Sequence, residues 1–320
     1  MMTWFLEAFV QEIGAQMAQR ALSRSLLRAF LFEVALLAVY FAGYGLEGLL
    51  GTLTRLAQGE PIQTAGILGV ILLLAWPISG VARRISGCVL QVAAGTMCWP
   101  SSLREKAIQS WKKRWENLNQ ELDELAKKTR NDPMQLSPQD RRRWVQIDKE
   151  LEELPKGDLW MPTRLGNILV GAAEYPRLRY GLDPYVCWPR LRFLLPEEAI
   201  RRVEQREERL LEAAESAGLT LGFILATPVL SILTMAARPP APHIVYIVGL
   251  LAFLTGLVTF LVLYWDMIRE ARNYGQELKA AFDLYRLRLY ESVGWPLPDP
   301  DREEEAGLGL SMFLWRGEKR

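Results

Sequence analysis

Four long apolar windows constrain this chain more than any other feature of its sequence. They cover residues 29–50, 65–82, 217–237 and 244–265. The last three contain no charged side chain over at least 18 residues, and a helix of that length, with some flanking turns, crosses a hydrocarbon core of roughly 30 Å. The sequence therefore predicts an all-α integral membrane protein with four transmembrane helices, arranged as two hairpins.

The first window is less clearly a membrane span than the other three. Glu33 and Glu47 lie near its two ends, so only residues 34–46 are free of charge. A buried helix of a soluble core is the alternative for this window. A carboxylate inside a membrane is costly and often serves as a proton or cation site. Glu33 is therefore a candidate pore or ion-binding residue, or else a carboxylate that snorkels to the surface or pairs with Arg28.

The distribution of Lys and Arg predicts how the chain is threaded through the membrane. Cytoplasmic flanks of membrane proteins are enriched in these residues. The two loops that follow the first and third windows hold only Arg55 and Arg238 of the 38 Lys and Arg residues. We therefore predict a multi-pass protein of the cytoplasmic (inner) membrane, with both termini and the large central region in the cytoplasm.

This threading divides the chain into five predicted parts. They are a cytoplasmic amphipathic N-terminal segment (1–28), a first transmembrane hairpin (29–82), a cytoplasmic helical domain (83–216), a second transmembrane hairpin (217–265) and a cytoplasmic C-terminal tail (266–320). The uncharged residues 85–99 are short for a fifth span, which would also place the basic residues that follow on the outside. We expect an interfacial or re-entrant helix there.

Two seams of apolar residues predict a helical hairpin in the cytoplasmic domain, one on each side of a break at residues 131–133. The seam residues alternate at spacings of three and four: Ile108, Trp111, Trp115, Leu118, Leu122 and Leu125, then Trp144, Ile147, Leu151 and Leu154. Ser137 is the predicted N-cap of the second helix. The seams either pack against each other or, through Trp111 and Trp115, dock onto a partner protein or a second copy.

The segment 161–198, which we call the collar, mixes proline and arginine with tryptophan and tyrosine. Residues 162–167 are predicted to turn into a short amphipathic helix with Leu165, Ile168, Leu169 and Ala172 on one face, and this helix is expected to end at Tyr175-Pro176. Asp183 is expected to cap another short turn, which Trp188-Pro189 should interrupt. A long helix is predicted from Glu197 to residue 237.

Rings and cations of this kind suit the headgroup layer of a membrane. The collar is therefore interpreted either as a packing and anchoring element or as a site for anionic lipid or another anion. The candidate ligands of such a site are Arg164, Arg177, Arg179, Arg190 and Arg192.

Small residues in the third window predict close helix packing. Gly218, Gly222 and Ala226 recur every fourth residue, a pattern that lets two membrane helices approach closely. The pattern leaves open whether the neighbouring helix belongs to the same chain or to a second subunit.

Several functional classes are disfavoured by the sequence. The net charge of +1 and the lack of a long basic stripe argue against a nucleic-acid partner. His243 is the single histidine, and Cys88, Cys98 and Cys187 form no CxxC pair, so we predict no metal and no cofactor. Phosphate-loop, nucleophile-elbow and HExxH motifs are missing. We expect a non-enzymatic protein.

Several motifs resemble those of an uncharacterised group of bacterial multi-pass membrane proteins. They are PTRLGN at 162–167, RYGLD at 179–183, WPRL at 188–191, LYESVGWPLP at 289–298, which contains GWPLP, and FLWRG at 313–317. The resemblance implies a membrane location and transfers no activity and no functional residue.

These observations favour a membrane scaffold or regulatory protein that presents cytoplasmic helices to partner proteins. A homo-oligomeric ion channel, with Glu33 in its pore, is the main alternative. An accessory subunit of a larger membrane complex is the second alternative. The predicted partners are the lipid bilayer and either further copies of the chain or an unidentified protein.

Overall fold

The computed structural model describes residues 22–42, 51, 54, 61–128, 137–236 and 242–317. Helices make up 88% of these residues, which contain no strand, so the prediction of an all-α chain is confirmed. Most of the predicted N-terminal segment 1–28 and the loops around Glu47, Arg55 and Arg238 lie outside the described residues.

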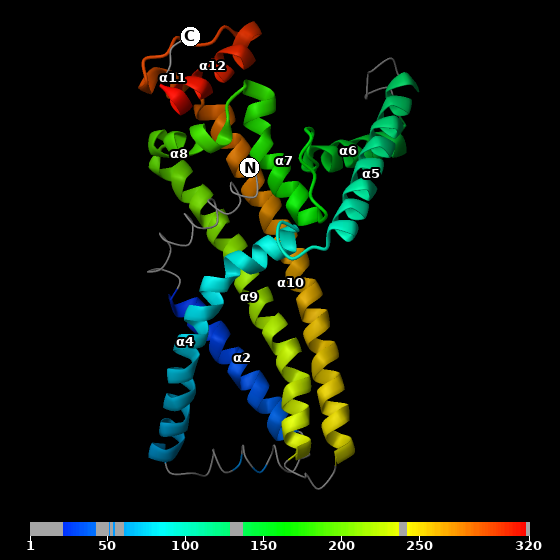
Figure 1. The fold of residues 1–320 in the computed structure, drawn as a ribbon, viewed down its shortest axis with the longest axis vertical. Coiled ribbons are helices and arrows are strands. Elements are labelled where there is room, and N and C mark those ends of the chain that lie inside the picture. The colour runs from blue at the N-terminus through cyan, green and yellow to red at the C-terminus, as the bar shows by residue number, and fades with distance from the viewer. Residues whose placement is uncertain are drawn as a thin grey trace. The chain divides into compact units, whose positions relative to one another are not determined.

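The helices follow one another along the chain as Figure 1 shows. They are α2 (Leu22–Ala42), α4 (Pro61–Ala94), α5 (Ser101–Lys128), α6 (Pro138–Glu153), α7 (Arg164–Tyr180), α8 (Pro184–Leu194), α9 (Glu197–Ala236), α10 (Pro242–Tyr285), α11 (Leu287–Ser292), the 3-10 turn η2 (Pro300–Arg302) and α12 (Glu303–Arg316). Their contacts define two compact units. Of the described residues, unit 1 takes those within 91–210 and 268–317, and unit 2 takes those within 22–90 and 211–267.

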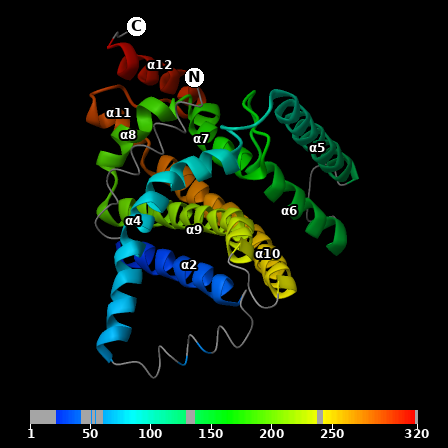
Figure 2. The same ribbon diagram turned by 60° about the horizontal axis from the view of Figure 1, so that its bottom comes forward.

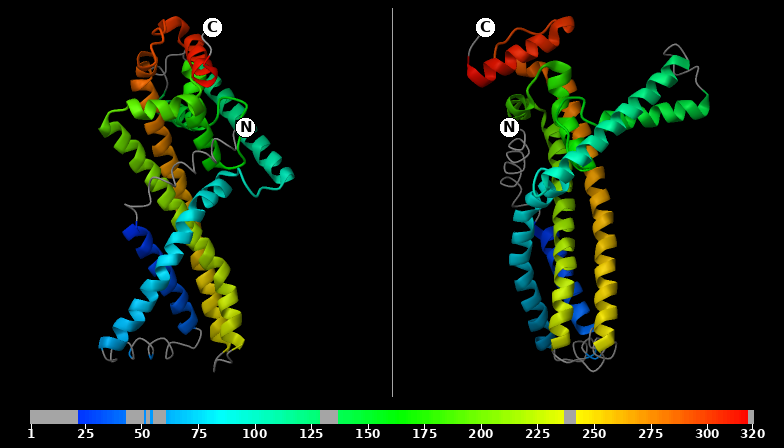
Figure 3. Two further views of the ribbon diagram at one scale, coloured as in Figure 1. Left: turned by 60° about the vertical axis from the view of Figure 1, so that its left-hand side comes forward. Right: turned by 45° about the vertical axis from the view of Figure 1, so that its right-hand side comes forward.

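In unit 2, the helices α9 and α10 run side by side (Figure 3). Glycines of α10 permit the close approach. A Cβ atom at Gly256 would lie 2.8 Å from the Ile224 side chain, and one at Gly249 would lie 2.4 Å from the Ser231 hydroxyl. Because position 256 faces 224 and position 249 faces 231, the two helices are antiparallel.

Two helices in the described part of the chain are long and apolar enough to cross a membrane. They are Glu197–Ala236 and His243–Tyr285, whose most apolar windows have mean hydropathies of 2.0 and 2.5. Only 17% of each window is buried, whereas a core helix of a soluble protein would be mostly covered by other residues. This composition indicates membrane association.

Residues 85–94 do not form a helix of their own, contrary to the prediction for 85–99. They continue α4, which has no break between residue 61 and residue 94. No proline or charged residue interrupts the pattern there, so the helix propagates until Gly95. Gly95 has a positive φ of 81°, and Cys98, with φ 61°, completes the turn into α5.

The predicted hairpin of seams is present in unit 1 as α5 packed against α6 (Figure 2). Leu118, Leu125, Ile147, Leu151 and Leu154 form its buried core. Two ion pairs show that the helices are antiparallel, because Arg143 meets Glu121 at 2.6 Å while Arg114 meets Glu150 at 2.5 Å. Ser137 caps α6 as predicted, since its hydroxyl accepts the Asp140 N–H at 3.2 Å.

The collar folds into α7 and α8, which begin where the sequence predicts and end later. Thr163 caps α7 and Asp183 caps α8 through their side-chain oxygens. The predicted breaks at Pro176 and Pro189 are wrong, because both prolines lie inside helices. A proline removes one backbone hydrogen bond, and the burial of Pro176 among packed neighbours offsets that loss.

The end of α7 is set by a glycine instead. Gly181 adopts a left-handed φ of 68°, and its N–H donates to the Arg177 carbonyl at 3.0 Å. A Cβ atom at Gly181 would lie 2.0 Å from the Glu304 carbonyl oxygen, and one at Gly307 would lie 1.8 Å from the Tyr180 carbonyl oxygen. Helix α12 therefore crosses the end of α7 at two positions where only glycine fits.

Three of the motif segments, RYGLD, LYESVGWPLP and FLWRG, meet at this crossing in unit 1. The Asp183 N–H donates to the Ser311 hydroxyl at 2.8 Å, which joins RYGLD to α12. Trp295 stacks on Phe313 with ring centroids 4.9 Å apart, and Tyr185 lies 5.6 Å from Trp315. These motif segments therefore pack against one another within one unit.

Candidate functional site

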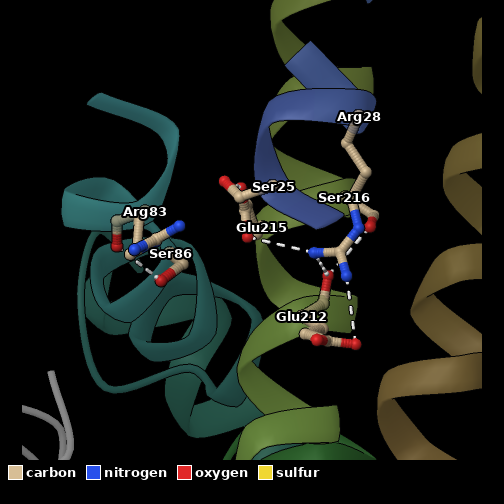
Figure 4. Close-up of polar contacts among 7 residues, drawn as sticks. All are labelled: Ser25, Arg28, Arg83, Ser86, Glu212, Glu215 and Ser216. Carbon is tan, nitrogen blue, oxygen red and sulfur yellow. Dashed lines mark hydrogen bonds and ion pairs between the residues drawn. The ribbon is translucent and has the colours of Figure 1, made fainter. Parts of the chain in front are cut away.

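A polar cluster joins α2 to α9 in unit 2. It consists of Ser25 and Arg28 from α2 and Glu212, Glu215 and Ser216 from α9, and we call it the α2–α9 cluster (Figure 4). Arg28 comes directly before the first apolar window, and Glu215 comes shortly before the third. The cluster therefore marks the point where both helices change from polar to apolar sequence.

The Arg28 guanidinium forms ion pairs with two carboxylates. Its Nη1 lies 3.0 Å from Glu215 Oε2, and its Nη2 lies 3.0 Å from Glu212 Oε2. Nη1 also donates to the Glu212 backbone carbonyl at 3.4 Å. Ser25 donates its hydroxyl to the remaining Glu215 oxygen, Oε1. One cation thus serves two carboxylates, and both Glu215 oxygens have a donor.

The burial of Glu215 makes its pairing with Arg28 important for the stability of unit 2. The Glu215 side chain is only 5% exposed, while those of Arg28 and Glu212 are 22% and 24% exposed. A buried carboxylate is tolerated when it is paired and hydrogen-bonded, and removing its partner is strongly unfavourable. The cluster therefore fixes α2 against α9. On α4, Arg83 and Ser86 are drawn nearby in Figure 4, where Ser86 donates to the Arg83 carbonyl at 2.7 Å.

An apolar groove of about 400 Å³ adjoins the cluster in unit 2. Arg28, Ser216 and three threonines supply its polar groups, and apolar side chains of α2 and α9 form most of the rest of its wall. Leu31, Phe32, Leu219 and Phe223 are among these. The volume lies within the range of small-molecule pockets, and the lining suits a hydrocarbon chain better than a polar ligand.

The chemistry available to the cluster is binding and orientation. The Ser25 hydroxyl donates to the Glu215 carboxylate, which is also paired with Arg28. Glu215 is therefore a poor base for activating Ser25 as a nucleophile. Within the described residues, no group of three His, Cys, Asp or Glu side chains could hold a metal ion.

Glu33 is buried in α2 and does not pair with Arg28. Its exposed fraction is 8%, and neither carboxylate oxygen accepts a hydrogen bond from any described residue. The pairing with Arg28 considered from the sequence is therefore wrong, because Arg28 is occupied by Glu212 and Glu215. Glu33 remains an isolated buried carboxyl group.

The small residues of α9 contact other helices of the same unit. A Cβ atom at Gly218 would lie 3.0 Å from the Val89 side chain of α4, and one at Gly222 would lie 3.8 Å from Phe32 of α2. Ala226 is half-buried. For both glycines, the neighbouring helix that the sequence left open belongs to this chain.

The five collar arginines do not converge on a common site. Arg164 pairs with Glu153 at 3.2 Å, Arg177 with Glu174 at 2.9 Å and Arg192 with Glu204 at 3.0 Å. The other two bind groups of a different kind. Arg179 lies over the rings of Tyr175 and Tyr180, and Arg190 donates to the Val186 carbonyl at 2.7 Å. Each arginine thus has a partner inside unit 1.

Trp111 and Trp115 also contact their own chain. The Trp111 indole N–H donates to the Pro162 carbonyl at 3.2 Å. The Trp115 ring meets Trp160 edge to face, with centroids 6.4 Å apart. Both tryptophans pack on the hairpin core, which favours the packing interpretation of the seam over docking.

Burial raises the pKa values of two acidic groups in unit 1. Burial raises the pKa of the Glu174 carboxyl; Asp158 acts in the same direction, while Arg177 and the Gly157 N–H oppose it. Burial also raises the pKa of the Cys187 thiol to about 11. A thiol with so high a pKa is a poor nucleophile at neutral pH.

Sequence reasoning missed Ser25, Glu212 and Glu215 as site residues. They had a usable signal, since each α9 carboxylate lies shortly before an apolar window and Arg28 lies directly before another. Polar residues at equivalent depths of two neighbouring spans are candidates to pair. The signal does not say which two windows are neighbours, and the structure supplies that information.

The comparisons with known proteins give no further assignment. No protein-family model matches the chain, and neither the curated proteins nor the solved structures give a match.

Proposed function

We propose that the chain is a four-span membrane protein of the inner membrane, with residues 83–216 and both termini in the cytoplasm. The observation that carries this proposal is the exposure of large apolar side chains along unit 2. Examples are Leu73 and Trp76 on α4, Leu225 and Ile232 on α9, and Val262 on α10. Such a surface is unfavourable in water and suits a lipid environment. The resemblance to bacterial multi-pass membrane proteins agrees with this location.

Within this topology the chain acts as a non-enzymatic scaffold or regulatory protein that presents helices of unit 1 to a partner protein. An exposed apolar stripe on α12 supports this role. Leu308, Met312 and Trp315 are 49%, 46% and 60% exposed, and their spacing of four and three residues places them on one face. Exposed apolar side chains that include a tryptophan are typical of protein interfaces.

The native mass of the complex tests this role. The full chain is solubilised in mild detergent and compared with a Leu308→Ser/Met312→Ser variant. We expect a mass above the 36.5 kDa of one chain, due to a second protein, and loss of that protein in the variant. Phe193→Ser, at a residue that is 90% exposed on α8, serves as the control and should keep the partner. A monomer, or a partner kept by both variants, contradicts the proposal.

A homo-oligomeric ion channel is the second candidate, and the isolated Glu33 carboxyl favours it. A buried carboxyl without a hydrogen-bonding partner inside a predicted span is suited to bind a proton or a cation. The channel predicts a complex made only of copies of this chain. It also predicts unitary currents in planar bilayers that change in a Glu33→Gln variant, and silent bilayers would count against it.

A further inference from the structure

A charged cleft of about 380 Å³ lies in unit 1 between α6, α7 and α10. Four cationic residues line it, namely Lys149, Arg269, Arg272 and Lys279, together with two carboxylates, Glu152 and Glu153. The lining therefore carries two more positive than negative charges. None of the α2–α9 cluster residues and none of the five collar arginines lines this cleft.

Both carboxylates are already paired with cations. Glu153 lies 2.8 Å from Arg272 Nε and 3.2 Å from Arg164 Nη2, so two arginines share it. Glu152 lies 3.3 Å from Lys279 Nζ, which also donates to the Glu152 carbonyl at 3.2 Å. These pairs tie α6 to α7 and α10, and they leave the excess positive charge to the remaining cations.

The remaining cations are open to solvent. Lys149 is exposed and makes no ion pair with any described residue. Arg269 lies 3.5 Å from Glu270, but 68% of its side chain is exposed. The charged groups of both side chains can therefore be reached by a ligand from solvent.

The α10 wall of the cleft is a row of hydrogen-bond donors. Arg269, Arg272, Asn273, Gln276 and Lys279 all line it, at spacings that place them along one side of the helix. Ala172 and Gly275 also line the cleft, and a Cβ atom at Gly275 would lie 2.9 Å from the Ala172 methyl group. The absence of a side chain at Gly275 therefore lets α7 and α10 approach closely beside the donors.

We propose that this cleft binds a phosphate monoester. Its two excess positive charges match a group that carries up to two negative charges at neutral pH, and its several donors match the oxygens of a phosphate. A volume of about 380 Å³ holds the phosphate together with a small attached group. The phosphate belongs to a lipid headgroup or to a soluble phosphoester. This site is independent of the scaffold role, since it depends on residues outside α12.

Isothermal titration calorimetry of the full chain in neutral detergent tests the proposal. Glycerol 3-phosphate is the soluble probe, dioctanoyl phosphatidic acid is the lipid probe, and dioctanoylglycerol is the lipid without a phosphate. We expect phosphatidic acid to bind and dioctanoylglycerol not to bind. If glycerol 3-phosphate binds as tightly as phosphatidic acid, the ligand is a soluble phosphoester. If glycerol 3-phosphate does not bind, the ligand is a lipid headgroup.

Two matched double variants decide whether the binding occurs in this cleft. Lys149→Gln/Arg269→Gln removes the two accessible cations, and we expect it to weaken binding at least about tenfold, as expected for lost charge-assisted hydrogen bonds. Arg142→Gln/Arg201→Gln removes two exposed arginines that do not line the cleft, and it should bind within about twofold of the native chain. Equal affinity of the two variants, or no binding of either phosphate probe, would overturn the proposal. All four positions are exposed, and circular dichroism confirms that the variants fold.

Discussion

Replacing Arg28 by Met is expected to destabilise unit 2 strongly, because Glu215 would then be buried without a cation. Met keeps an unbranched apolar side chain like the aliphatic stem of Arg, and it removes the guanidinium group with its charge and its hydrogen-bond donors. The Glu215 side chain is 5% exposed and would keep only the Ser25 hydroxyl as a donor. Breaking a buried ion pair from one side costs about 3–5 kcal/mol. Since Arg28 is itself 22% exposed, we expect the lower end of that range.

A double-mutant cycle isolates the interaction between Arg28 and Glu215. Glu215→Leu in the Arg28→Met background removes the orphaned carboxylate, and replacing both partners by apolar residues is often neutral or stabilising. We therefore expect the double variant to recover most of the loss. Glu212→Gln serves as the control, because Glu212 is 24% exposed, and a pair this open to solvent contributes at most about 1 kcal/mol.

The assay is reversible unfolding in mixed micelles at increasing denaturing-detergent fraction. The free energy of unfolding of each variant gives the coupling energy, which we expect to exceed about 1.5 kcal/mol. Two results would refute the reasoning. One is an Arg28→Met variant within about 0.5 kcal/mol of the native chain, and the other is a Glu215→Leu effect that does not depend on residue 28.

Three further predictions concern unit 1. A Cβ atom at Gly307 would lie 1.8 Å from the Tyr180 carbonyl oxygen, whereas the atom nearest to a Cβ at Gly309 is 3.6 Å away. Thermal unfolding should therefore show that Gly307→Ala destabilises the protein by about 1–3 kcal/mol or more and that Gly309→Ala stabilises it by up to about 1 kcal/mol. Equal effects of the two substitutions would contradict the crossing of α7 and α12. Burial raises the pKa of Glu174 above its ordinary value of 4.5, so the folded state binds the proton more tightly and stability falls as pH rises from 4.5 through the folded pKa. Glu174→Gln should flatten thermal stability over that interval, and an unchanged slope would count against it. Cys98 is exposed while Cys187 is buried with a pKa of about 11, so maleimide followed by peptide mapping should modify Cys98 and spare Cys187 until the protein is unfolded.

Local signals predicted the helix starts well. Ser137 and Asp183, the two predicted caps, cap helices through side-chain oxygens, and these contacts involve only neighbouring residues. The seam of the hairpin was equally readable, because a repeat of three and four residues fixes which side chains share a face. Such features depend on the chain within a few turns, so the sequence contains them directly.

Helix ends and long-range contacts could not be predicted from local sequence signals in the same way. Pro176 looked like a stop signal, yet the helix continues to Gly181, because burial offsets one missing hydrogen bond and a left-handed residue then ends the helix. Arg28 finds Glu215 across a separation of 187 residues. The collar arginines suggested an anion site. Arg177 and Arg179 instead meet Glu174 and Tyr175 one turn away, because α7 continues through Pro176, while Arg192 meets Glu204 of another helix.

The side of the membrane on which each segment lies tests the central claim most directly. Single cysteines are introduced at Thr54, Arg238, Gln146 and Glu305 of a chain without its three native cysteines, and intact cells are treated with a membrane-impermeant maleimide. The four-span topology predicts that positions 54 and 238 react from outside, while positions 146 and 305 react only after the membrane is opened. Labelling of position 146 in intact cells, or protection of position 54 or 238, would contradict it.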